Sequence, residues 1–229
     1  MTLKEAILLR HSVRRYTEVP IESEKIEILR AAVNKANEAS NLNIQLVTNE
    51  PKAFSTGNFF HFEYGYFRGV RNYLVMAGPA DKASKEAIGY EGEKIVLLAQ
   101  TLGLNSCWVG LTYREVSGVF RRRPGDRIHC VIALGYGETQ GVQHNLRPIE
   151  SFIAADAHLH LPDWFLEGMR AAVLAPTAVN QQKFCFSLEN GNVVEARTRF
   201  SLIGYTHVDL GIVKCHFEIG AGAENFSWK

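Results

Sequence analysis

Apolar residues recur at intervals of three and four along much of this 229-residue chain. This spacing is typical of helices that bury one face. Near the start, Thr2 and Glu5 have the spacing of a capping box, which favours a helix there. One later stretch is apolar almost all round, as expected of a helix in the middle of a domain. The helices predicted in this way cover residues 2–10, 22–39, 90–104 and 207–222.

Apolar, β-branched runs bounded by Gly or Pro predict strands between these helices. Asn190 and Gly191, within KFCFSLENGNVVEAR, predict the turn of a hairpin. The aromatic, glycine-rich segment 54–67 has no clear period, and we interpret it as an ordered, partly buried loop that could set substrate choice. The predicted strands cover residues 43–49, 71–77 and 127–138.

Two stretches of the chain resemble each other. Residues 29–47 and 169–186 each contain RAAV, followed by a hydroxyl residue, two residues, an Asn, one residue and a Gln. The matching positions are Ser40, Asn43 and Gln45 in the first stretch and Thr177, Asn180 and Gln182 in the second.

The two long helices repeat an interval in the same order. The matching landmarks are Ile95, Val96 and Gly103 in the first helix and Ile212, Val213 and Gly220 in the second. The shared order predicts an internal duplication, with a shortened second copy. We expect a half at residues 1–150 and a half at residues 151–229. With no flexible linker between them, they should form one compact unit.

The 25 basic and 24 acidic residues nearly cancel, which disfavours nucleic acid or an anionic membrane as partner. A small molecule is the expected partner. No CxxC pair and no N-terminal apolar run long enough for a signal peptide is present, so we expect reduced cysteines and a cytoplasmic location. The four single cysteines are Cys107, Cys130, Cys185 and Cys215.

The segment RHSVRRY follows the first predicted helix. If it is extended, its alternation places Arg10, Ser12 and Arg14 on one side, with His11 between them. Two guanidinium groups and a hydroxyl on one side suit a phosphate, which accepts several charge-assisted hydrogen bonds. A basic, solvated surface is the alternative interpretation, and both readings place the arginines at the surface.

The same segment resembles the phosphate- and ribityl-binding motif of the FMN-dependent nitroreductase family, R-x-S-x-R-x-[FY], here ending at Tyr16. LGLNSCWVGL is similar to the Leu-Gly-Leu-x-x-x-Trp-x-Gly turn of that family, and VIALGYGE to its apolar strand ending in Gly-Tyr. Together these marks cover residues 1–150. The chain looks like the TM-type branch of the family.

The resemblance implies a three-layer α/β/α fold of the α+β class. In the family, FMN lies at a homodimer interface, where an Ala-Pro-Ser-x-x-Asn-x-Gln segment reaches over from the other subunit. APTAVNQQ, in the second stretch, matches that segment better than the first stretch, which lacks the proline. The second half in turn lacks a counterpart of RHSVRRY. One chain would therefore imitate the family dimer and hold one flavin, with a homodimer of such chains as the alternative.

The site residues implied by the resemblance fall into three groups. One group would hold the FMN phosphate and ribityl chain, one would pack against the isoalloxazine, and one is the turn whose backbone amide points at flavin N5, where hydride arrives and leaves. In that order they are Arg10, His11, Ser12, Arg14 and Arg147; Pro176, Thr177, Ala178 and Asn180; and Trp108, Val109 and Gly110.

The implied activity is hydride transfer from NAD(P)H through FMN to a nitroaromatic, a quinone or a similar small acceptor. The flavin carries the electrons, so we name no catalytic side chain. A flavin-binding protein without turnover is the alternative from another class. A dehalogenase or a flavin-degrading enzyme on the same fold is a further alternative.

Two polar clusters remain outside this scheme. His158 and His160 could bind a metal, but no further ligands stand at metal spacing, so a surface loop is favoured and no metal is expected. Residues 121–123 are three arginines. A solvated helix end is favoured there over a contact with the phosphate of NADPH.

Overall fold

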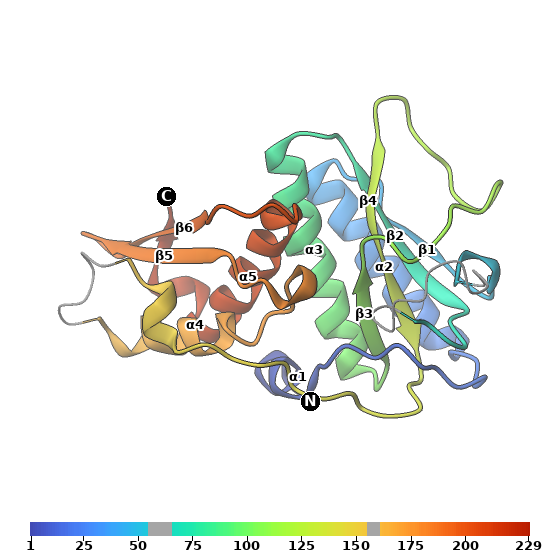
Figure 1. Cartoon of the computed structure of the whole chain (residues 1–229), viewed down its shortest axis with the longest axis horizontal. Coiled ribbons are helices and arrows are strands. Elements are labelled where there is room, and N and C mark those ends of the chain that lie inside the picture. The colour runs from blue at the N-terminus through green and yellow to red at the C-terminus, as the bar shows by residue number, and fades with distance from the viewer. Residues whose placement is uncertain (55–65, 155–160) are drawn as a thin grey trace.

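The helices predicted from spacing are all present in the computed structural model, which describes residues 1–54, 66–154 and 161–229 (Figure 1). The predicted α+β class is confirmed. The helices are α1 (Leu3–Leu9), α2 (Ser23–Ser40), α3 (Lys82–Thr101), α4 (Asp163–Ala172) and α5 (Thr206–Ala221), and short 3-10 helices include η1 (Lys52–Phe54), η2 (Ile149–Phe152), η4 (Ala178–Asn180) and η5 (Ala223–Asn225).

Helix boundaries follow local capping chemistry. At α1, the Thr2 side chain accepts from the Glu5 N–H and the Glu5 carboxylate accepts from the Thr2 N–H, which is the predicted capping box. Helix α3 begins eight residues before the predicted start. Asp81 caps it there by accepting the Ser84 N–H at 2.9 Å. The sequence pattern missed this first part because residues 82–87 are polar or small and lie near the surface.

The first half contains a four-stranded antiparallel sheet in the order β1-β2-β4-β3. The predicted strands appear as β1, β2 and β4, whereas β3 was taken for part of a turn. Helices α2 and α3 cover one face of this sheet. The strands are β1 (Gln45–Val47), β2 (Asn72–Gly78), β3 (Asn105–Val109) and β4 (Arg127–Gly135).

The second half contains a smaller sheet in the order β5-β6-β7. Strands β5 (Phe184–Glu189) and β6 (Val193–Thr198) form the predicted antiparallel hairpin, with Asn190 and Gly191 in its turn. Strand β7 (Ser227–Trp228) pairs with β6 in parallel. Helix α5 packs on this sheet, so that α3 and α5 lie between the two sheets (Figure 1).

Helices α3 and α5 cross at two glycines. A Cβ at Gly89 would lie 1.9 Å from the Val208 carbonyl oxygen, and a Cβ at Gly211 would lie 1.9 Å from that of Glu86. Each glycine therefore faces the residue three positions before the other, so the contact has the reciprocity of a two-fold interface. Only glycine permits such a close approach of two helix backbones.

This crossing corrects one landmark of the sequence comparison. Gly103 follows α3 in the left-handed region (φ 78°), whereas Gly220 lies inside α5, packed against Gly168 of α4. The two glycines therefore have different structural roles. The crossing instead pairs Gly89 with Gly211, so the two helices correspond with a different register.

One segment singled out in the sequence lies mostly outside the described residues. Most of the aromatic segment 54–67 lies outside the described residues, so its predicted role is not addressed. Among the residues that are described, no helix combines the length and the apolar character needed to cross a bilayer.

Candidate functional site

The RHSVRRY segment runs extended from the end of α1 along the edge strand β3. The Val13 N–H donates to the Ser106 carbonyl at 3.0 Å, and Ser12 and Ser106 form a parallel bridge. Val13 and Tyr16 are buried under the sheet face. The extended conformation that the alternation required is therefore present.

Arg10, Ser12 and Arg14 gather around the buried thiol of Cys107 on β3. Burial raises the pKa of Cys107, whereas the Arg14 charge, a hydrogen bond with Ser12 and the Arg10 charge act in the opposite direction. Of the three predicted phosphate ligands, Ser12 therefore hydrogen-bonds with this thiol, and the two arginines act on it through their charge.

Arg10 is buried, which corrects the expectation that both arginines lie at the surface. Its side chain is 3% exposed, and its Nε lies 3.6 Å from Oε1 of Glu93 on α3. Glu93 also accepts from Nε1 of Trp108 at 2.8 Å and contacts Nε2 of His216 at 2.9 Å. The other ring nitrogen of His216 lies 3.1 Å from the Ala171 carbonyl oxygen.

This buried polar network joins both halves of the chain. Arg10 and Trp108 belong to the first half, His216 stands on α5 of the second, and the Glu93 side chain between them is 0% exposed. Sequence analysis missed Glu93 and His216, which are 123 positions apart. Residues this far apart carry no local signal of their contact, and Glu93 is one of several charged residues in α3.

Two histidines near Arg10 have lowered pKa values. Burial and, to a smaller extent, the Arg10 charge lower the pKa of His11. Burial also lowers the pKa of His144, and nearby charges including that of Arg10 add to the effect, against a hydrogen bond to the Val173 carbonyl. The Arg10 charge that disfavours a proton here would favour an anion such as a phosphate.

Residues 136–148, which run from β4 to η2 near the end of the first half, pass over His11, and we call them the connecting segment. A Cβ at Gly141, in the left-handed region, would lie 2.8 Å from Cβ of His11. Further along, the Asn145 carbonyl accepts from Nδ2 of Asn180 at 3.0 Å and from Nε2 of Gln182 at 2.8 Å. Thus the matching Asn and Gln of the second stretch hold the connecting segment in place.

The Asn and Gln of the first stretch make the same arrangement. Nδ2 of Asn43 and Nε2 of Gln45 both donate to the Arg121 carbonyl, at 3.0 and 2.8 Å. In both stretches the Gln also donates to the Asn Oδ1 at 2.8 Å. We refer to each Asn-Gln pair as a carbonyl clamp, the first at residues 43 and 45 and the second at residues 180 and 182.

Residues 176–182, the segment predicted to pack on the isoalloxazine, have an unusual backbone. Val179, Asn180 and Gln182 lie in the left-handed region, with φ of 47°, 55° and 47°. This conformation is costly for a β-branched residue such as Val179, and residues held in it cluster at ligand sites. Pro176, Thr177 and Ala178 are partly exposed beside them.

Asp209 on α5 forms hydrogen bonds with the segment 176–182. Its carboxylate accepts from the Ala178 N–H at 2.9 Å and from Nε2 of Gln181 at 2.6 Å. Burial raises the pKa of Asp209 to about 7, against the effect of these two hydrogen bonds. Sequence analysis did not single out Asp209.

The predicted N5 turn contacts the second half. The Tyr205 hydroxyl donates to the Gly110 carbonyl at 3.0 Å, and a Cβ at Gly110 would lie 2.8 Å from the Tyr205 ring. Val109 is buried and Trp108 is bound to Glu93, so the turn is fixed from both sides. Tyr205 is a further residue that sequence analysis missed.

Apolar side chains are exposed next to this turn and to the segment 176–182. Hydrogen bonds of Gln181 with the Gly204 carbonyl and the Ser201 hydroxyl tie the loop before α5 to that segment. An apolar rim of this kind suits a flat ring. Its exposed members are Leu111, Val179, Phe200, Leu202 and Ile203.

Arg147 is exposed and lies with its guanidinium over the Phe152 ring, 5.4 Å from the centroid. Arg147 therefore packs against η2, and its predicted role at the phosphate stays a prediction.

The remaining polar clusters are simpler. Arg122 pairs with Glu115 and Arg123 with Asp126, and all three arginines of the run 121–123 are exposed. His158 and His160 lie outside the described residues. Within the described ranges, no group of three His, Cys, Asp or Glu side chains could hold a metal ion.

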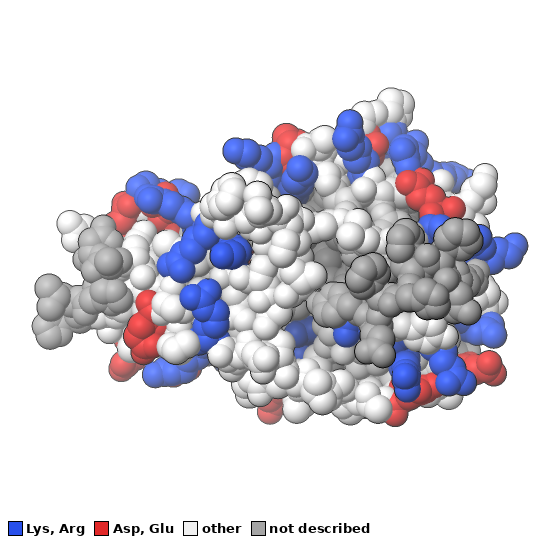
Figure 2. All heavy atoms as spheres, viewed as in Figure 1, with Lys and Arg blue, Asp and Glu red and all other residues white. Residues whose placement is uncertain are grey.

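Charge is spread over the surface in a way that matches the near-zero net charge. On the face shown in Figure 2, Lys and Arg lie mainly around the edge with Asp and Glu between them, and the middle is largely uncharged. A continuous basic surface for nucleic acid is not seen on this face.

Comparison with known proteins gives a family and a fold. The family model described as "Putative TM nitroreductase" matches residues 2–221. The crystal structure of a putative nitroreductase from Thermotoga maritima is 23% identical to this chain, with a TM-score of 0.65. The match covers 98% of this chain and 85% of the Thermotoga maritima chain. No match was found among curated proteins.

Two further structures share the fold at lower identity. One, from Desulfovibrio desulfuricans, is described as a putative nitroreductase in complex with FMN; it is 19% identical with a TM-score of 0.52, over 71% of this chain and 98% of its own. Nitroreductase A from Vibrio parahaemolyticus is 19% identical with a TM-score of 0.53, over 71% of this chain and 79% of its own. At these identities the likeness supports the fold alone.

Proposed function

Because the chain belongs to the TM nitroreductase family, we propose that it is an FMN-dependent oxidoreductase that passes hydride from NAD(P)H to a small electron acceptor. The observation that carries this proposal is the path of the connecting segment, which packs on His11 at Gly141 and is bound at Asn145 by Asn180 and Gln182, so that RHSVRRY and residues 176–182 both contact it.

The residues of this region fit an FMN phosphate. Nε of Arg10 is buried and lies 3.6 Å from Glu93, without a hydrogen bond among the described residues, so a ligand could still bind this donor. Ser12 and Arg14 would hold the phosphate, and the nearby Arg10 charge would favour it.

The remaining predicted residues would orient the ring. The segment 176–182 would pack against the isoalloxazine, because Asp209 and the second carbonyl clamp fix its backbone. The amide at the Val109–Gly110 turn would donate to flavin N5, and the apolar rim would exclude water. When bound, FMN accepts hydride from NAD(P)H and delivers it to the acceptor.

The site that we propose is built by one chain acting as its own partner. Support comes from the two carbonyl clamps, which share geometry, and from the reciprocal crossing of α3 and α5. In addition, Gln45 begins β1 and Gln182 lies just before β5, so each clamp leads into two antiparallel strands and a long helix, in the order β1-β2-α3 and β5-β6-α5. The second copy lacks an RHSVRRY segment and a counterpart of β4, so one flavin site is complete.

A flavin-binding protein without turnover is the second candidate. It is favoured by the Tyr205 ring, which packs against Gly110 and narrows access to the proposed N5 position. The two candidates differ in one measurement. Rapid bleaching of the flavin by NADH or NADPH in anaerobic stopped flow, reversed by an acceptor, supports the enzyme; a flavin that neither nucleotide reduces supports the binding protein.

The phosphate assignment is tested by Arg14→Ala, with Arg15→Ala as the matched control. Arg15 follows directly but is exposed and alternates to the other side of the segment. A charge-assisted hydrogen bond contributes about 1.5–3 kcal/mol, so Arg14→Ala should weaken FMN binding by roughly 10- to 100-fold in fluorescence titrations of the apoprotein. Equal affinities for the two variants would refute the assignment.

A further inference from the structure

Tyr205, the residue before α5, joins the second half of the chain to the predicted N5 turn. Its hydroxyl donates to the Gly110 carbonyl at 3.0 Å, across 95 positions of sequence. Burial raises the pKa of Tyr205, so the hydroxyl keeps its proton and remains a donor. The ring lies against the turn, because a Cβ at Gly110 would lie 2.8 Å from Cζ of Tyr205. Any side chain at position 110 would therefore displace the ring.

The backbone of Tyr205 is held in an unfavourable conformation. Its φ of 61° and ψ of −1° lie in the left-handed region, which is costly for a bulky aromatic residue. Residues stay in this region only where surrounding contacts hold them, and they cluster at ligand sites. One such contact is the Tyr205 carbonyl, which accepts the Asp209 N–H at 2.8 Å as α5 begins. The start of α5 therefore helps to fix the direction of the Tyr205 side chain.

The loop before Tyr205 is also bonded to the segment 176–182, which would contact the isoalloxazine. Nε2 of Gln181 donates to the Gly204 carbonyl at 2.9 Å, and Oε1 of Gln181 accepts from the Ser201 hydroxyl at 2.5 Å. This loop therefore links two parts of the proposed flavin site, the segment and the N5 turn.

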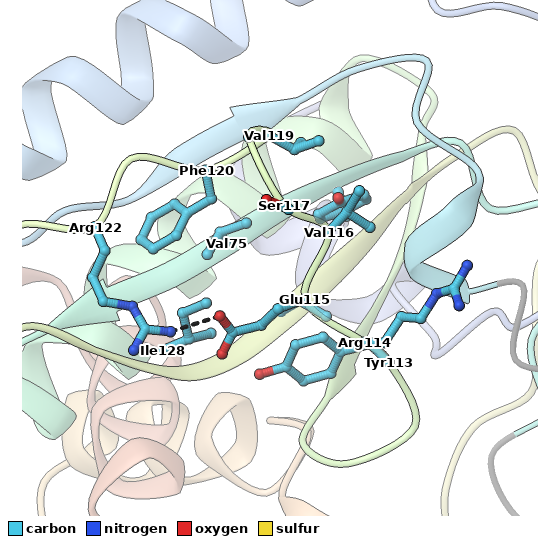
Figure 3. A pocket seen from close by; sticks show the side chains of 13 residues that line it. Val75, Tyr113, Arg114, Glu115, Val116, Ser117, Val119, Phe120, Arg122 and Ile128 are labelled. Carbon is cyan, nitrogen blue, oxygen red and sulfur yellow. Dashed lines mark hydrogen bonds and ion pairs between the residues drawn. The ribbon is translucent and has the colours of Figure 1, made fainter.

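The chain that follows the turn gives it little support. Leu111 is 84% exposed, and residues 113–120 line a cavity of about 340 Å³ (Figure 3). Side chains that face a cavity lack contacting atoms on one side, so they restrain the backbone less. Glycine is also the residue that loses most conformational freedom when it is fixed. The Tyr205 hydroxyl therefore gives Gly110 a restraint that the residues after it do not.

We propose that Tyr205 is a positioning residue, which acts through Gly110 to orient the backbone amide towards flavin N5. The N–H and the carbonyl of Gly110 share one Cα, so a fixed carbonyl limits the rotation that would turn the N–H away. The inference rests on the proposed function, because it requires FMN in this site. N5 of oxidised FMN can accept a hydrogen bond, whereas N5 of reduced FMN carries a hydrogen. A well-oriented amide should therefore stabilise bound oxidised FMN more than bound reduced FMN.

The test is Tyr205→Phe, which removes the hydroxyl and keeps the ring. The affinities of the apoprotein for oxidised FMN and for chemically reduced FMN are measured by anaerobic titration. A hydrogen bond of this kind changes affinity by about three- to tenfold, so the variant should lose that factor for oxidised FMN and keep its affinity for reduced FMN. The changed ratio corresponds to a rise of about 15–30 mV in the midpoint potential of the bound flavin, at about 30 mV per tenfold for two electrons.

Tyr90→Phe is the matched control. The Tyr90 hydroxyl also joins the two halves, because it donates to Glu218 at 2.6 Å across 128 positions of sequence, but it links α3 to α5 and not to the N5 turn. Loss of this hydroxyl should leave the ratio of the two FMN affinities as in wild type.

The ratio separates positioning from a structural role. If Tyr205→Phe binds both forms of FMN with the wild-type ratio, or with the ratio changed in the opposite direction, the inference is wrong although the proposed function stands. A wild-type protein that binds neither form of FMN refutes the proposed function itself.

Discussion

Glu93 is the residue on which the buried contacts between the two halves depend. Glu93→Gln keeps an acceptor for Trp108 but removes the charge opposite Arg10, leaving a cation with 3% exposure uncompensated. Breaking a buried pair costs about 3 kcal/mol, and we expect a loss of that order in the free energy of unfolding from urea titration. Glu91→Gln is the control, because its partner Lys94 is half exposed. Equal losses for the two variants would contradict this view of Glu93.

Asp209 gives a pH dependence whose sign is defined. Its pKa in the folded protein, about 7, lies above the ordinary value of 3.8, so the folded state holds this proton more tightly. The stabilisation that comes from this tighter binding of the proton is complete below about pH 4 and is lost as the pH rises towards 7. Asp209→Asn has no proton to lose. The stability of the variant relative to wild type should therefore rise with pH over this range, by roughly 4 kcal/mol at most.

The measurement is the free energy of unfolding of both proteins at several pH values between 4 and 8. The readout is the slope, against pH, of the difference in unfolding free energy between Asp209→Asn and wild type. Asn also changes the hydrogen bond with Gln181, but this shifts the difference by the same amount at every pH. A difference that is flat across this pH range would mean that Asp209 is ionised as in water.

The residue scale also shows what sequence can and cannot predict. The extended conformation on which the prediction for RHSVRRY depends is present, since period-two geometry is local, whereas a common ligand of Arg10, Ser12 and Arg14 stays a prediction. The burial of Arg10 was not predictable, because it depends on Glu93 and His216, which only folding brings near. Asp209 was missed for the same reason: its partner Ala178 is 31 positions away.

At the scale of elements, the crossing of α3 and α5 predicts a sharp intolerance. Gly211→Ala would place a methyl group 1.9 Å from the Glu86 carbonyl oxygen, so the helices must separate. We expect a loss of about 3 kcal/mol or more, or failure to fold, in thermal or urea unfolding. Lys85→Ala, near the surface of α3, is the control and should change stability by less than about 0.5 kcal/mol. A Gly211→Ala protein as stable as this control would exclude the close crossing.

Elements whose ends carry a local sequence signal were predicted well. The capping box of α1 and the Asn-Gly turn of the β5–β6 hairpin are local signals, and both elements formed where expected. Strand β3 was missed because five residues between Gly103 and Gly110 mix polar and apolar side chains. Only pairing with β4 makes that segment a strand.

At the scale of the whole molecule, the duplication that we propose within one chain predicts the stoichiometry. An internal dimer completes its site without a neighbour, so a monomeric particle in light scattering should carry one FMN. A dimeric particle with two FMN would be compatible with a pair of internal dimers. The proposal is overturned by a flavin-bound structure in which residues 176–182 of a neighbouring chain contact the flavin held by Arg14.

The connecting segment, held at Asn145 by the second carbonyl clamp, also determines how the site responds to dilution. Halves on one chain meet at an effective concentration set by the tether, in the millimolar range for short connections, whatever the concentration of protein in solution. A site assembled from two separate subunits weakens when the subunits dissociate, whereas the site that we propose within one chain would not. Flavin affinity should therefore be the same at nanomolar and micromolar protein, and cutting the chain between residues 141 and 148 should make it depend on concentration.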